Sequence, residues 1–369
     1  MRRICCFCEC WESGGIESFL NNVLLHMELS EMEVDIVAAC MKESIFTMGL
    51  ETKGIHFIEL SGKLRSLENY LAFRKLVRER QYDVIHFNLF QGLSLYYVQI
   101  AKEEGVPVRI AHSHGAGLRN SWTKQLKLMI HRFCIKLWAS AATERWACSN
   151  AAAHFLFSDI ESFCMIPNGI EAKRFCFNAF ERNKIRSELK LTNNYVIGNV
   201  GRFSSEKNQS FLLDVFVQLI KMRPNSRLLL VGDGLEKSIL EKKSKQLGIA
   251  EYVMFYGISE HIERLLWAMD VFVFSSLFEG LGLACIEAQA AGLPVICSEG
   301  VPEEAQITPL VKTVNLNLGA QRWAEELLQW NPEVSRTNGV RMVREAGFDI
   351  SDVSDLISKR YGESRYGAT

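Results

Sequence analysis

Short apolar runs with the length of β-strands alternate with longer helical segments along almost the whole chain. Because parallel strands need a crossover between them, usually a helix, this alternation predicts an α/β protein with parallel sheets. In the first half we expect strands near Ile4–Phe7, Val34–Ala38, His56–Ile58, Val84–Phe87, Val108–His112 and Trp146–Cys148, and helices over Gly15–Met27, Ser66–Arg80, Leu93–Glu104 and Ser121–Ala139. In the second half we expect strands near Tyr195–Val200, Arg227–Val231, Tyr252–Phe255, Val271–Phe274 and Pro294–Ile296, and helices over Lys207–Lys221, Leu235–Leu247, Glu260–Ala268 and Leu283–Ala291.

The pattern therefore predicts two doubly wound halves. A chain of 369 residues is long for one core and suits two domains. We expect the first domain to cover residues 1–170 and the second to cover residues 171–347, with the connection after the Pro-Asn-Gly turn that ends at Gly169. A ligand is expected in the cleft between the halves, outside the carboxyl ends of the strands.

The composition of the chain argues against several classes of function. The net charge of -1 gives no general attraction to nucleic acid. No signal peptide opens the chain and no run of about 18 uncharged apolar residues occurs, so we expect a cytoplasmic protein. The 11 cysteines include a cluster at Cys5, Cys6, Cys8 and Cys10, which fits buried thiols of a strand better than a metal site. No D-x-D motif is present, so we expect neither a metal nor a cofactor.

One segment, Phe274–Ile296, carries the strongest functional signal. Glu279 and Glu287 stand there with seven residues between them, and a Gly-Leu-Gly turn lies where a strand gives way to a helix. Such a unit directs backbone N–H groups and the positive end of a helix dipole at an anion. The two carboxylates can accept hydrogen bonds from hydroxyl groups on either side of that anion. A phosphate flanked by two sets of hydroxyls describes a nucleotide sugar.

Two cations and two glycines extend this hypothesis. Arg202 and Lys207 follow the strand that ends at Val200, and together they suit a diphosphate. Alone, the pair would more simply be a surface arginine and the start of a solvated helix. Gly14 and Gly15 follow the first strand and open a helix, where glycine lets the backbone approach a ligand closely.

The run E-G-L-G-L-A-C-I-E-A, which begins at Glu279, resembles the E-x7-E signature of the retaining glycosyltransferases of the GT4 family. Six further segments fall in the order of that family: Gly14-Gly15, I-P-N-G-I at 166–170, G-R-F-S-S-E-K-N at 201–208, V-G-D-G at 231–234, F-Y-G at 255–257 and G-L-P-V-I at 292–296. The resemblance implies the GT-B fold, in which two Rossmann-like domains face each other across a cleft. It also implies that a C-terminal helix within residues 348–369 packs back on the first domain.

The resemblance implies roles for the matched side chains. Glu287 would bind the ribose hydroxyls and Glu279 would face the hexose hydroxyls. Arg202 and Lys207 would hold the diphosphate and stabilise the charge on the leaving nucleoside diphosphate in place of a metal. The matched backbone positions are Gly14 and Gly15 over the diphosphate and the acceptor, Gly282 and Leu283 at the β-phosphate, and Tyr256 and Gly257 at the base. The Gly232-Asp233-Gly234 turn either joins the site or is only a turn.

The strand that ends in R-I-A-H-S-H-G, residues 109–115, commonly bears a histidine near the anomeric carbon in this family. We favour His114, which lies beyond the strand and before a glycine, but His112 stays open. His86 and Asn88 end another strand, and they either shape the acceptor pocket or are structural.

Residues 119–138 form a basic amphipathic segment. Its cations are Arg119, Lys124, Lys127, Arg132 and Lys136, and Trp122, Leu126, Met129, Phe133 and Leu137 recur at helical spacing. The helix either lies on an anionic membrane, which would suit a lipid-linked acceptor, or packs this apolar face inward.

The sequence thus predicts transfer of a hexosyl group from a nucleoside diphosphate sugar, with UDP favoured, to an acceptor hydroxyl with retention of configuration. The overall pattern resembles bacterial enzymes that build exopolysaccharide or capsule repeats on a lipid carrier. One alternative is a UDP-sugar epimerase of the same fold, although such enzymes lack the E-x7-E arrangement. Another is a non-catalytic protein that binds a nucleotide sugar. A nicotinamide enzyme is disfavoured because no G-x-G-x-x-G follows the first strand.

Overall fold

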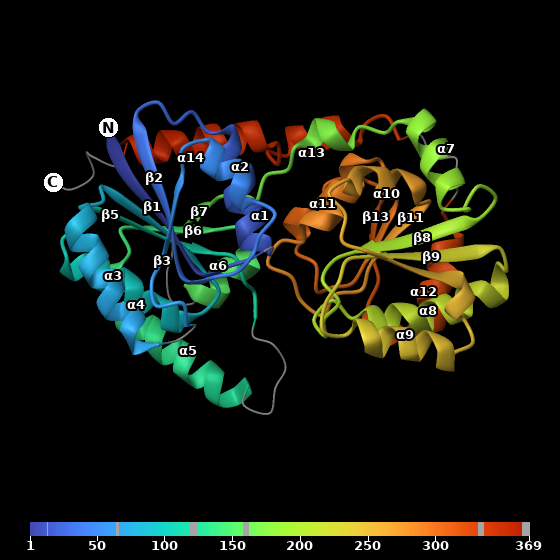
Figure 1. Ribbon diagram of the computed structural model, residues 1–369. Coiled ribbons are helices and arrows are strands. Elements are labelled where there is room, and N and C mark those ends of the chain that lie inside the picture. The colour runs from blue at the N-terminus through green and yellow to red at the C-terminus, as the bar shows by residue number, and fades with distance from the viewer. Residues whose placement is uncertain (13, 64–65, 118–123, 158–161, 331–335, 364–369) are drawn as a thin grey trace. The chain divides into compact units, whose positions relative to one another are not determined.

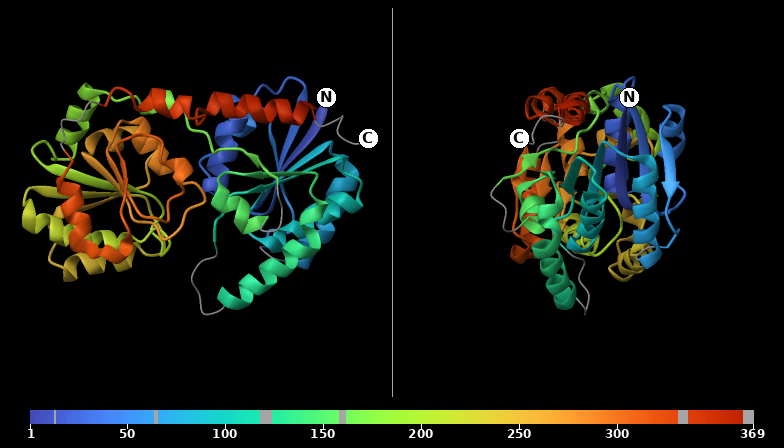
Figure 2. Two further views of the ribbon diagram at one scale, coloured as in Figure 1. Left: turned by 180° about the vertical axis from the view of Figure 1, so that it is seen from behind. Right: turned by 90° about the vertical axis from the view of Figure 1, so that its left-hand side faces the viewer.

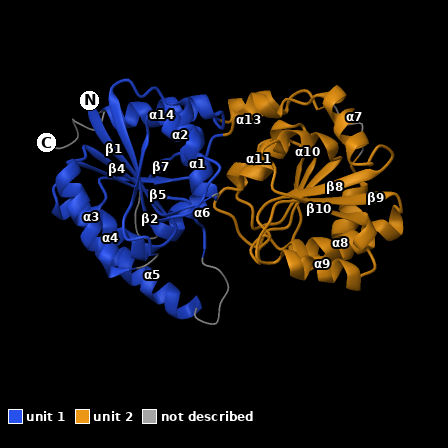
Figure 3. Cartoon of the chain, in the orientation of Figure 1, with its two compact units in different colours: residues 1–169, 347–369 blue, residues 170–346 orange. Residues whose placement is uncertain are grey.

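The computed structural model describes residues 1–12, 14–63, 66–117, 124–157, 162–330 and 336–363 (Figure 1). The chain divides into two compact units (Figure 3). Unit 1 consists of Met1–Gly169 with Gly347–Thr369, and unit 2 consists of Ile170–Ala346. Each unit is built on its own parallel sheet, and each is described by itself below.

Unit 1 has a seven-stranded sheet in the order β3-β2-β1-β4-β5-β6-β7. The strands are β1 (Arg2–Trp11), β2 (Met32–Met41), β3 (His56–Glu59), β4 (Val84–Leu89), β5 (Val108–Ser113), β6 (Glu144–Ala147) and β7 (Cys164–Met165). The helices are α1 (Gly15–His26), α2 (Thr47–Thr52), α3 (Leu67–Arg80), α4 (Leu95–Glu103), α5 (Lys124–Trp138), α6 (Asn150–Leu156) and α14 (Ile350–Glu363). The strand order reverses between β1 and β4, which marks the position where a doubly wound sheet opens a crevice.

The C-terminal helix α14 belongs to the core of unit 1. Ile350, Val353 and Ile357 are buried in the same apolar cluster as α1, and the Ser354 hydroxyl donates to the Val23 carbonyl of α1 at 3.2 Å. A Cβ atom on Gly169 would lie 2.9 Å from the Cα of Ile350, so only glycine lets the two segments approach so closely. Figure 2 shows α14 running beside α1 from two further directions.

Unit 2 has a six-stranded sheet in the order β10-β9-β8-β11-β12-β13. Its strands are β8 (Tyr195–Val200), β9 (Ser226–Val231), β10 (Val253–Gly257), β11 (Val271–Phe274), β12 (Val295–Cys297) and β13 (Val311–Thr313). Its helices are α7 (Ala179–Glu188), α8 (Gln209–Met222), α9 (Lys237–Gln246), α10 (Ile262–Ala268), α11 (Leu283–Ala290), α12 (Gly319–Leu328) and α13 (Gly339–Glu345). Here the order reverses between β8 and β11, so the loops after these two strands meet at the switch point.

Every strand and helix expected from the sequence is present, with shifts of a few residues at the ends. Helix α8 begins at Gln209 rather than at Lys207, because Asn208 precedes it in the left-handed region with φ 54°. The N-terminal part of the expected basic helix, residues 119–123, lies outside the described residues. No helix in the described part of the chain is long and apolar enough to cross a membrane.

Candidate active site

Two loops of unit 2 lie side by side at the switch point. The loop after β8 runs over residues 201–208, and the loop after β11 runs over residues 275–282. The Leu277 N–H donates to the Glu206 carbonyl at 2.7 Å, and the Ser275 hydroxyl donates to the Asn208 carbonyl at 3.1 Å. These bonds join segments about 70 residues apart in sequence, and they bring Lys207, one of the predicted cations, to Glu279, one of the predicted carboxylates.

Lys207 and Glu279 form the central contact of this site. The Lys207 Nζ donates to both carboxylate oxygens of Glu279, at 2.7 and 2.8 Å, and it lies 5.2 Å from the centroid of the Phe274 ring. The Lys207 side chain is 22% exposed and that of Glu279 only 8%. A carboxylate this buried needs a charged partner to offset its lost hydration, and Lys207 supplies it.

Gly282 sets the geometry at the start of α11. It precedes the helix with φ 90°, a conformation that other residues rarely adopt. A Cβ atom there would also lie 3.0 Å from the Phe274 ring and 3.7 Å from the Cγ of Glu279. The Cys285 N–H donates to the Gly282 carbonyl at 2.9 Å, so the helical ladder begins at this residue. The Gly282–Leu283 amides therefore lie in the turn whose N–H groups point out of the helix end.

Glu287 lies within α11 and is only partly exposed. Its pKa is raised to about 7, first because burial disfavours the charged carboxylate and also because Glu263 adds negative charge; Arg174 opposes the shift. Arg174 is itself engaged by Glu263, with 2.9 Å between the Arg174 Nε and the Glu263 Oε2. Among the described residues, no side chain forms a hydrogen bond or ion pair with the Glu287 carboxylate.

Arg202 is exposed on the loop after β8. Its carbonyl accepts a hydrogen bond of 3.1 Å from the buried Gln209 side chain, which also contacts Asn199 at 3.3 Å. This anchor holds the backbone of the loop while leaving the guanidinium on the surface.

The Gly232-Asp233-Gly234 turn has a packing role that the sequence left undecided. A Cβ atom on Gly232 would lie 2.1 Å from the Gly201 carbonyl oxygen, and one on Gly234 would lie 2.3 Å from the Phe203 carbonyl oxygen. The Phe203 N–H donates to the Asp233 carbonyl at 2.8 Å. Both glycines are therefore needed to seat this turn against the loop that carries Arg202.

Tyr256 and Gly257 end β10 beside that turn. Tyr256 is 40% exposed, and Gly257 has φ 92° with no atom within 4 Å of a built Cβ. The Gly232 N–H donates to the Gly257 carbonyl at 2.8 Å, which links the end of β10 to the end of β9. The pair thus lies on the same edge of the sheet as the loop after β8.

In unit 1, Gly14 and Gly15 open α1. Gly14 has an extended conformation with φ -119°, and a Cβ atom on Gly15 would meet no atom within 4 Å. Neither backbone strain nor crowding within unit 1 explains a glycine at position 15. Ser13, which precedes them, is outside the described residues.

The two candidate histidines are both buried, with ring centroids 4.0 Å apart, but they have different hydrogen-bond partners. His114 lies beyond β5, and its Nε2 is 2.9 Å from the Asn88 Oδ1. Burial lowers the pKa of His114 to about 3, so its imidazole is neutral at physiological pH. His112 is fully buried within β5, with its Nδ1 3.0 Å from the Nε2 of His86. The assignment of His114 as the site histidine stays a prediction.

His86 continues this chain of contacts to the C-terminal helix. Its Nδ1 lies 2.7 Å from the Tyr361 hydroxyl of α14, and it stacks on His112 with ring centroids 5.2 Å apart. The sequence offered no signal for the Tyr361 contact, because 275 residues separate the two partners. Asn88, by contrast, could have been paired with His114, since both end neighbouring strands.

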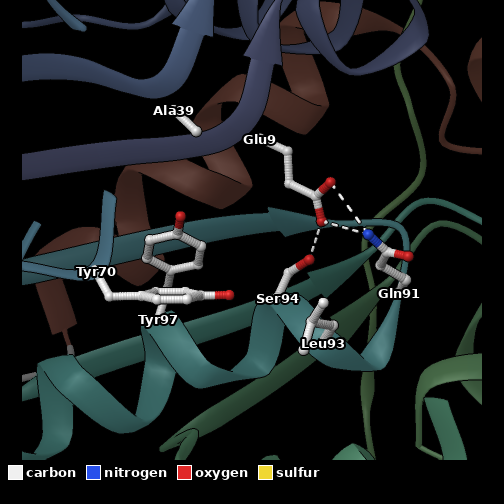
Figure 4. Close-up of a pocket in the computed structure, with 7 residues that line it drawn as sticks. All are labelled: Glu9, Ala39, Tyr70, Gln91, Leu93, Ser94 and Tyr97. Carbon is white, nitrogen blue, oxygen red and sulfur yellow. Dashed lines mark hydrogen bonds between the residues drawn. The ribbon is translucent and has the colours of Figure 1, made fainter. Parts of the chain in front are cut away.

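A small pocket lies at the switch point of unit 1 (Figure 4). Its polar end is the Glu9 carboxylate, which accepts from the Gln91 amide at 3.1 and 3.2 Å and from the Ser94 hydroxyl. Its aromatic wall consists of Tyr70 and Tyr97, whose rings lie 4.9 Å apart. The sequence did not single out these residues.

The basic helix α5 packs on unit 1 with a different face from the one considered in the sequence. Its buried residues are His131, Cys134 and Ile135. Leu126, Met129, Phe133 and Leu137 are exposed. The alternative in which this apolar stripe packs inward is therefore wrong, and Trp122 of the same stripe lies outside the described residues.

Comparisons with known proteins place the chain in a family. Residues 13–174 match the model of Glycosyltransferase Family 4, and residues 181–314 match that of the glycosyl transferases group 1. The chain is 30% identical over 329 residues to EpsF of Bacillus subtilis, a protein named as a glycosyltransferase, covering 85% of this chain and 84% of that protein. It is 26% identical over 245 residues to the UDP-Gal:alpha-D-GlcNAc-diphosphoundecaprenol alpha-1,3-galactosyltransferase of Escherichia coli, covering 64% of this chain and 62% of that enzyme.

Solved structures agree on the fold. HepE of Anabaena in complex with UDP-glucose has a TM-score of 0.80 at 20% identity, covering 98% of this chain and 100% of that chain. WaaG, a glycosyltransferase involved in lipopolysaccharide biosynthesis, has a TM-score of 0.72 at 14% identity, with 98% and 100% covered. These neighbours have the GT-B architecture that the sequence predicted. The chain therefore belongs to the GT4-type glycosyltransferases of group 1, and it is a glycosyltransferase with the GT-B fold.

Proposed function

We propose that this glycosyltransferase moves a hexosyl group from a UDP-sugar to an acceptor hydroxyl with retention of configuration. The observation that carries the proposal is the Lys207–Glu279 ion pair, which lies at the switch point of unit 2 beside the start of α11. The choice of UDP is supported by the UDP-Gal in the name of the Escherichia coli relative and by the UDP complexes of HepE.

The ion pair gives the donor site a simple exchange of partners. When a diphosphate arrives, Lys207 turns from Glu279 to the phosphate oxygens, joined by Arg202 and by the amides of Gly282 and Leu283. Glu279 is then available to accept hydrogen bonds from hexose hydroxyls, and Glu287 from ribose hydroxyls. Tyr256 and Gly257 would contact the base. Positive charge from the protein offsets the charge that develops on departing UDP, so no metal is required.

Transfer follows from this arrangement as a same-face displacement. The acceptor oxygen bonds to the anomeric carbon on the face from which UDP leaves. The bond from that carbon to the phosphate oxygen breaks, and the phosphate oxygen receives the acceptor's proton. His114 would contact the sugar as a neutral imidazole, since burial holds its pKa near 3. Gly14 and Gly15 would let the backbone approach the diphosphate.

Unit 1 would bind the acceptor and unit 2 the donor. The acceptor we favour is a lipid-linked saccharide of exopolysaccharide or capsule assembly, because the Escherichia coli relative is named for a diphosphoundecaprenol acceptor. The enzyme would then work in the cytoplasm, in peripheral contact with the membrane.

A thermal-shift screen against UDP, GDP, ADP and their common hexoses, with and without EDTA, tests the donor assignment. We expect stabilisation by UDP, more by one UDP-hexose, and no effect of EDTA. Stabilisation by GDP or ADP alone would mean that this nucleotide, and not UDP, is the donor nucleotide. If no nucleotide stabilised the protein, the proposed donor site would be contradicted. Conversion of a UDP-sugar to its epimer without acceptor would instead support the isomerase alternative.

A further inference from the structure

Helix α5 has one face committed to unit 1. His131 anchors this face from both ring nitrogens. The Gly92 N–H donates to its Nδ1 at 2.8 Å, and its Nε2 lies 2.8 Å from the Phe155 carbonyl oxygen. A Cβ atom on Gly92 would lie 2.5 Å from the His131 carbonyl oxygen, so the helix is seated tightly there. The rotation of α5 about its axis is thereby fixed.

The opposite face of α5 is apolar and exposed. Its five large residues, which we call the outer stripe, are Leu126, Met129, Ile130, Phe133 and Leu137. Their exposed fractions lie between 45% and 69%. The intervals of three and four residues place all five on one side of the helix. Scattered apolar residues on a surface are ordinary, but a continuous stripe along a whole helix marks an interaction surface.

Positive charge borders the outer stripe on one side. At 100° per residue, Arg132 and Lys136 fall on that flank of the stripe, whereas Lys127 falls between the buried residues Cys134 and His131. No aspartate or glutamate occurs between Lys124 and Trp138. An apolar stripe with two cations along one edge and no acidic residue on its helix is complementary to a lipid headgroup layer that carries negative charge.

We propose that the outer stripe of α5 is a membrane-docking surface for an anionic bilayer. The five apolar side chains enter the boundary between headgroups and acyl chains, and Arg132 and Lys136 contact lipid phosphates. Since His131 holds the opposite face on unit 1, the helix lies along the bilayer surface without leaving the unit. This docking surface rests on the proposed function, because a lipid-linked acceptor lies in a membrane.

The position of α5 in unit 1 suits membrane docking. It packs against α4 and lies on the outside of unit 1 in every view (Figure 1 and Figure 2). The 15 residues described for α5 are fewer than the roughly 20 that a helix needs to cross a bilayer. The outer stripe can therefore meet lipid only by lying in the interface plane.

Co-sedimentation of the full chain with vesicles tests the proposal. We would compare vesicles of phosphatidylcholine with vesicles that also contain one-third phosphatidylglycerol. The double variant Met129→Glu/Phe133→Glu should weaken binding to the anionic vesicles at least about tenfold, because two large apolar side chains leave the bilayer. Arg132→Gln/Lys136→Gln should weaken the same binding roughly tenfold while leaving the weak binding to neutral vesicles unchanged.

A matched control lies on α3 of the same unit. Leu67 and Leu71 are also four residues apart and are 79% and 72% exposed, but acidic Glu68 lies between them. Leu67→Glu/Leu71→Glu adds the same two charges, so we expect it to bind anionic vesicles like the wild type. Circular dichroism of all variants checks that the fold is kept.

Three outcomes would overturn the docking surface. The first is absence of wild-type binding to anionic vesicles, and the second is equal loss in the α3 control. The third is a dimer in lipid-free buffer that Met129→Glu/Phe133→Glu dissociates, which would make the stripe an interface between copies. UDP binding measured on the same samples distinguishes a failure of the proposed function from a failure of the docking surface. Vesicle binding without UDP binding would contradict the proposed function alone, and UDP binding without vesicle binding would contradict the docking surface alone.

Discussion

At the residue scale, Lys207 and Glu279 form an ion pair, whereas the sequence predicted them only as separate site residues. A cation beyond a strand and a carboxylate before a helix each have ordinary explanations on a surface. In the structure they meet 2.7 Å apart, with Glu279 almost wholly buried. Each neutralises the other there, and we propose that the donor substrate offers both of them other partners.

Glu279→Gln tests this exchange. The amide keeps the shape of the side chain but removes the charge that we expect to bind sugar hydroxyls in the transition state. Turnover should fall by on the order of 100-fold. The dissociation constant of UDP should change by less than about threefold, because Lys207 still reaches the diphosphate.

Asp214→Asn is the matched control, since Lys243 and Asp214 form a similar pair at 2.7 Å on the same unit. We expect this variant to keep wild-type turnover. Wild-type turnover in Glu279→Gln, measured as UDP released with acceptor present, would remove Glu279 from its assigned role.

The raised pKa of Glu287 predicts that donor binding depends on pH. Its carboxyl has a pKa raised to about 7, chiefly by burial, so in the free protein it is protonated below that pH and charged above it. Ribose hydroxyls donate most strongly to the charged form, so UDP affinity should rise as pH increases through about 7. Titration calorimetry at a series of pH values measures this. Glu287→Gln should flatten the profile, and an unchanged profile in that variant would assign the titration to another group.

At the scale of elements, α14 shows what a resemblance to a family predicts and what it leaves open. A helix within residues 348–369 was expected from that resemblance, and α14 is present over Ile350–Glu363. Its packing on α1 was expected only from the resemblance to a family. The contact of Tyr361 with His86 depends on the tertiary fold, because no local pattern links residues so far apart.

Tyr361→Phe measures how strongly this contact holds α14. The variant keeps the ring but leaves the Nδ1 of the fully buried His86 without its hydroxyl partner, which should cost about 1–3 kcal/mol of unfolding free energy. Urea unfolding followed by circular dichroism gives the value. Tyr96→Phe is the control, because Tyr96 packs between Tyr70 and Trp138 without a hydrogen bond among the described residues. Equal midpoints for both variants would mean that the Tyr361 hydroxyl does not stabilise unit 1.

Two short strands and the helices α2, α6, α7, α12 and α13 were not predicted from the sequence. Strand β7 has two residues and β13 has three, too few for an apolar pattern to stand out. The buried face of α5 was not predicted for a different reason. Its sequence contains two apolar stripes, and the hydrogen bonds of His131 to unit 1 decide which one is buried. The loop contacts at the switch point likewise follow from strand order, which a single sequence does not fix.

At the scale of the whole molecule, the two units are expected to divide the reaction. The cations and carboxylates that suit a nucleotide sugar lie in unit 2, while the buried histidines and the Glu9 pocket lie in unit 1. Both sheets reverse their strand order once, between β1 and β4 and between β8 and β11, so each unit has its own switch-point crevice. Each unit therefore has one switch-point edge, and we propose that each edge binds one of the two substrates.

His114→Ala tests the division. This change should leave the affinity for UDP within about twofold of wild type, because His114 would contact only the sugar and the charged groups that we expect to hold the diphosphate lie in unit 2. It should nevertheless lower turnover by at least about tenfold. His114→Asn separates shape from chemistry, since the amide keeps a polar group near Asn88. Both effects can be read from one protein sample, with calorimetry for UDP and product release for turnover. A loss of UDP affinity equal to the loss of turnover would mean that unit 1 helps to bind the nucleotide, and the division of substrates between the units would have to be redrawn.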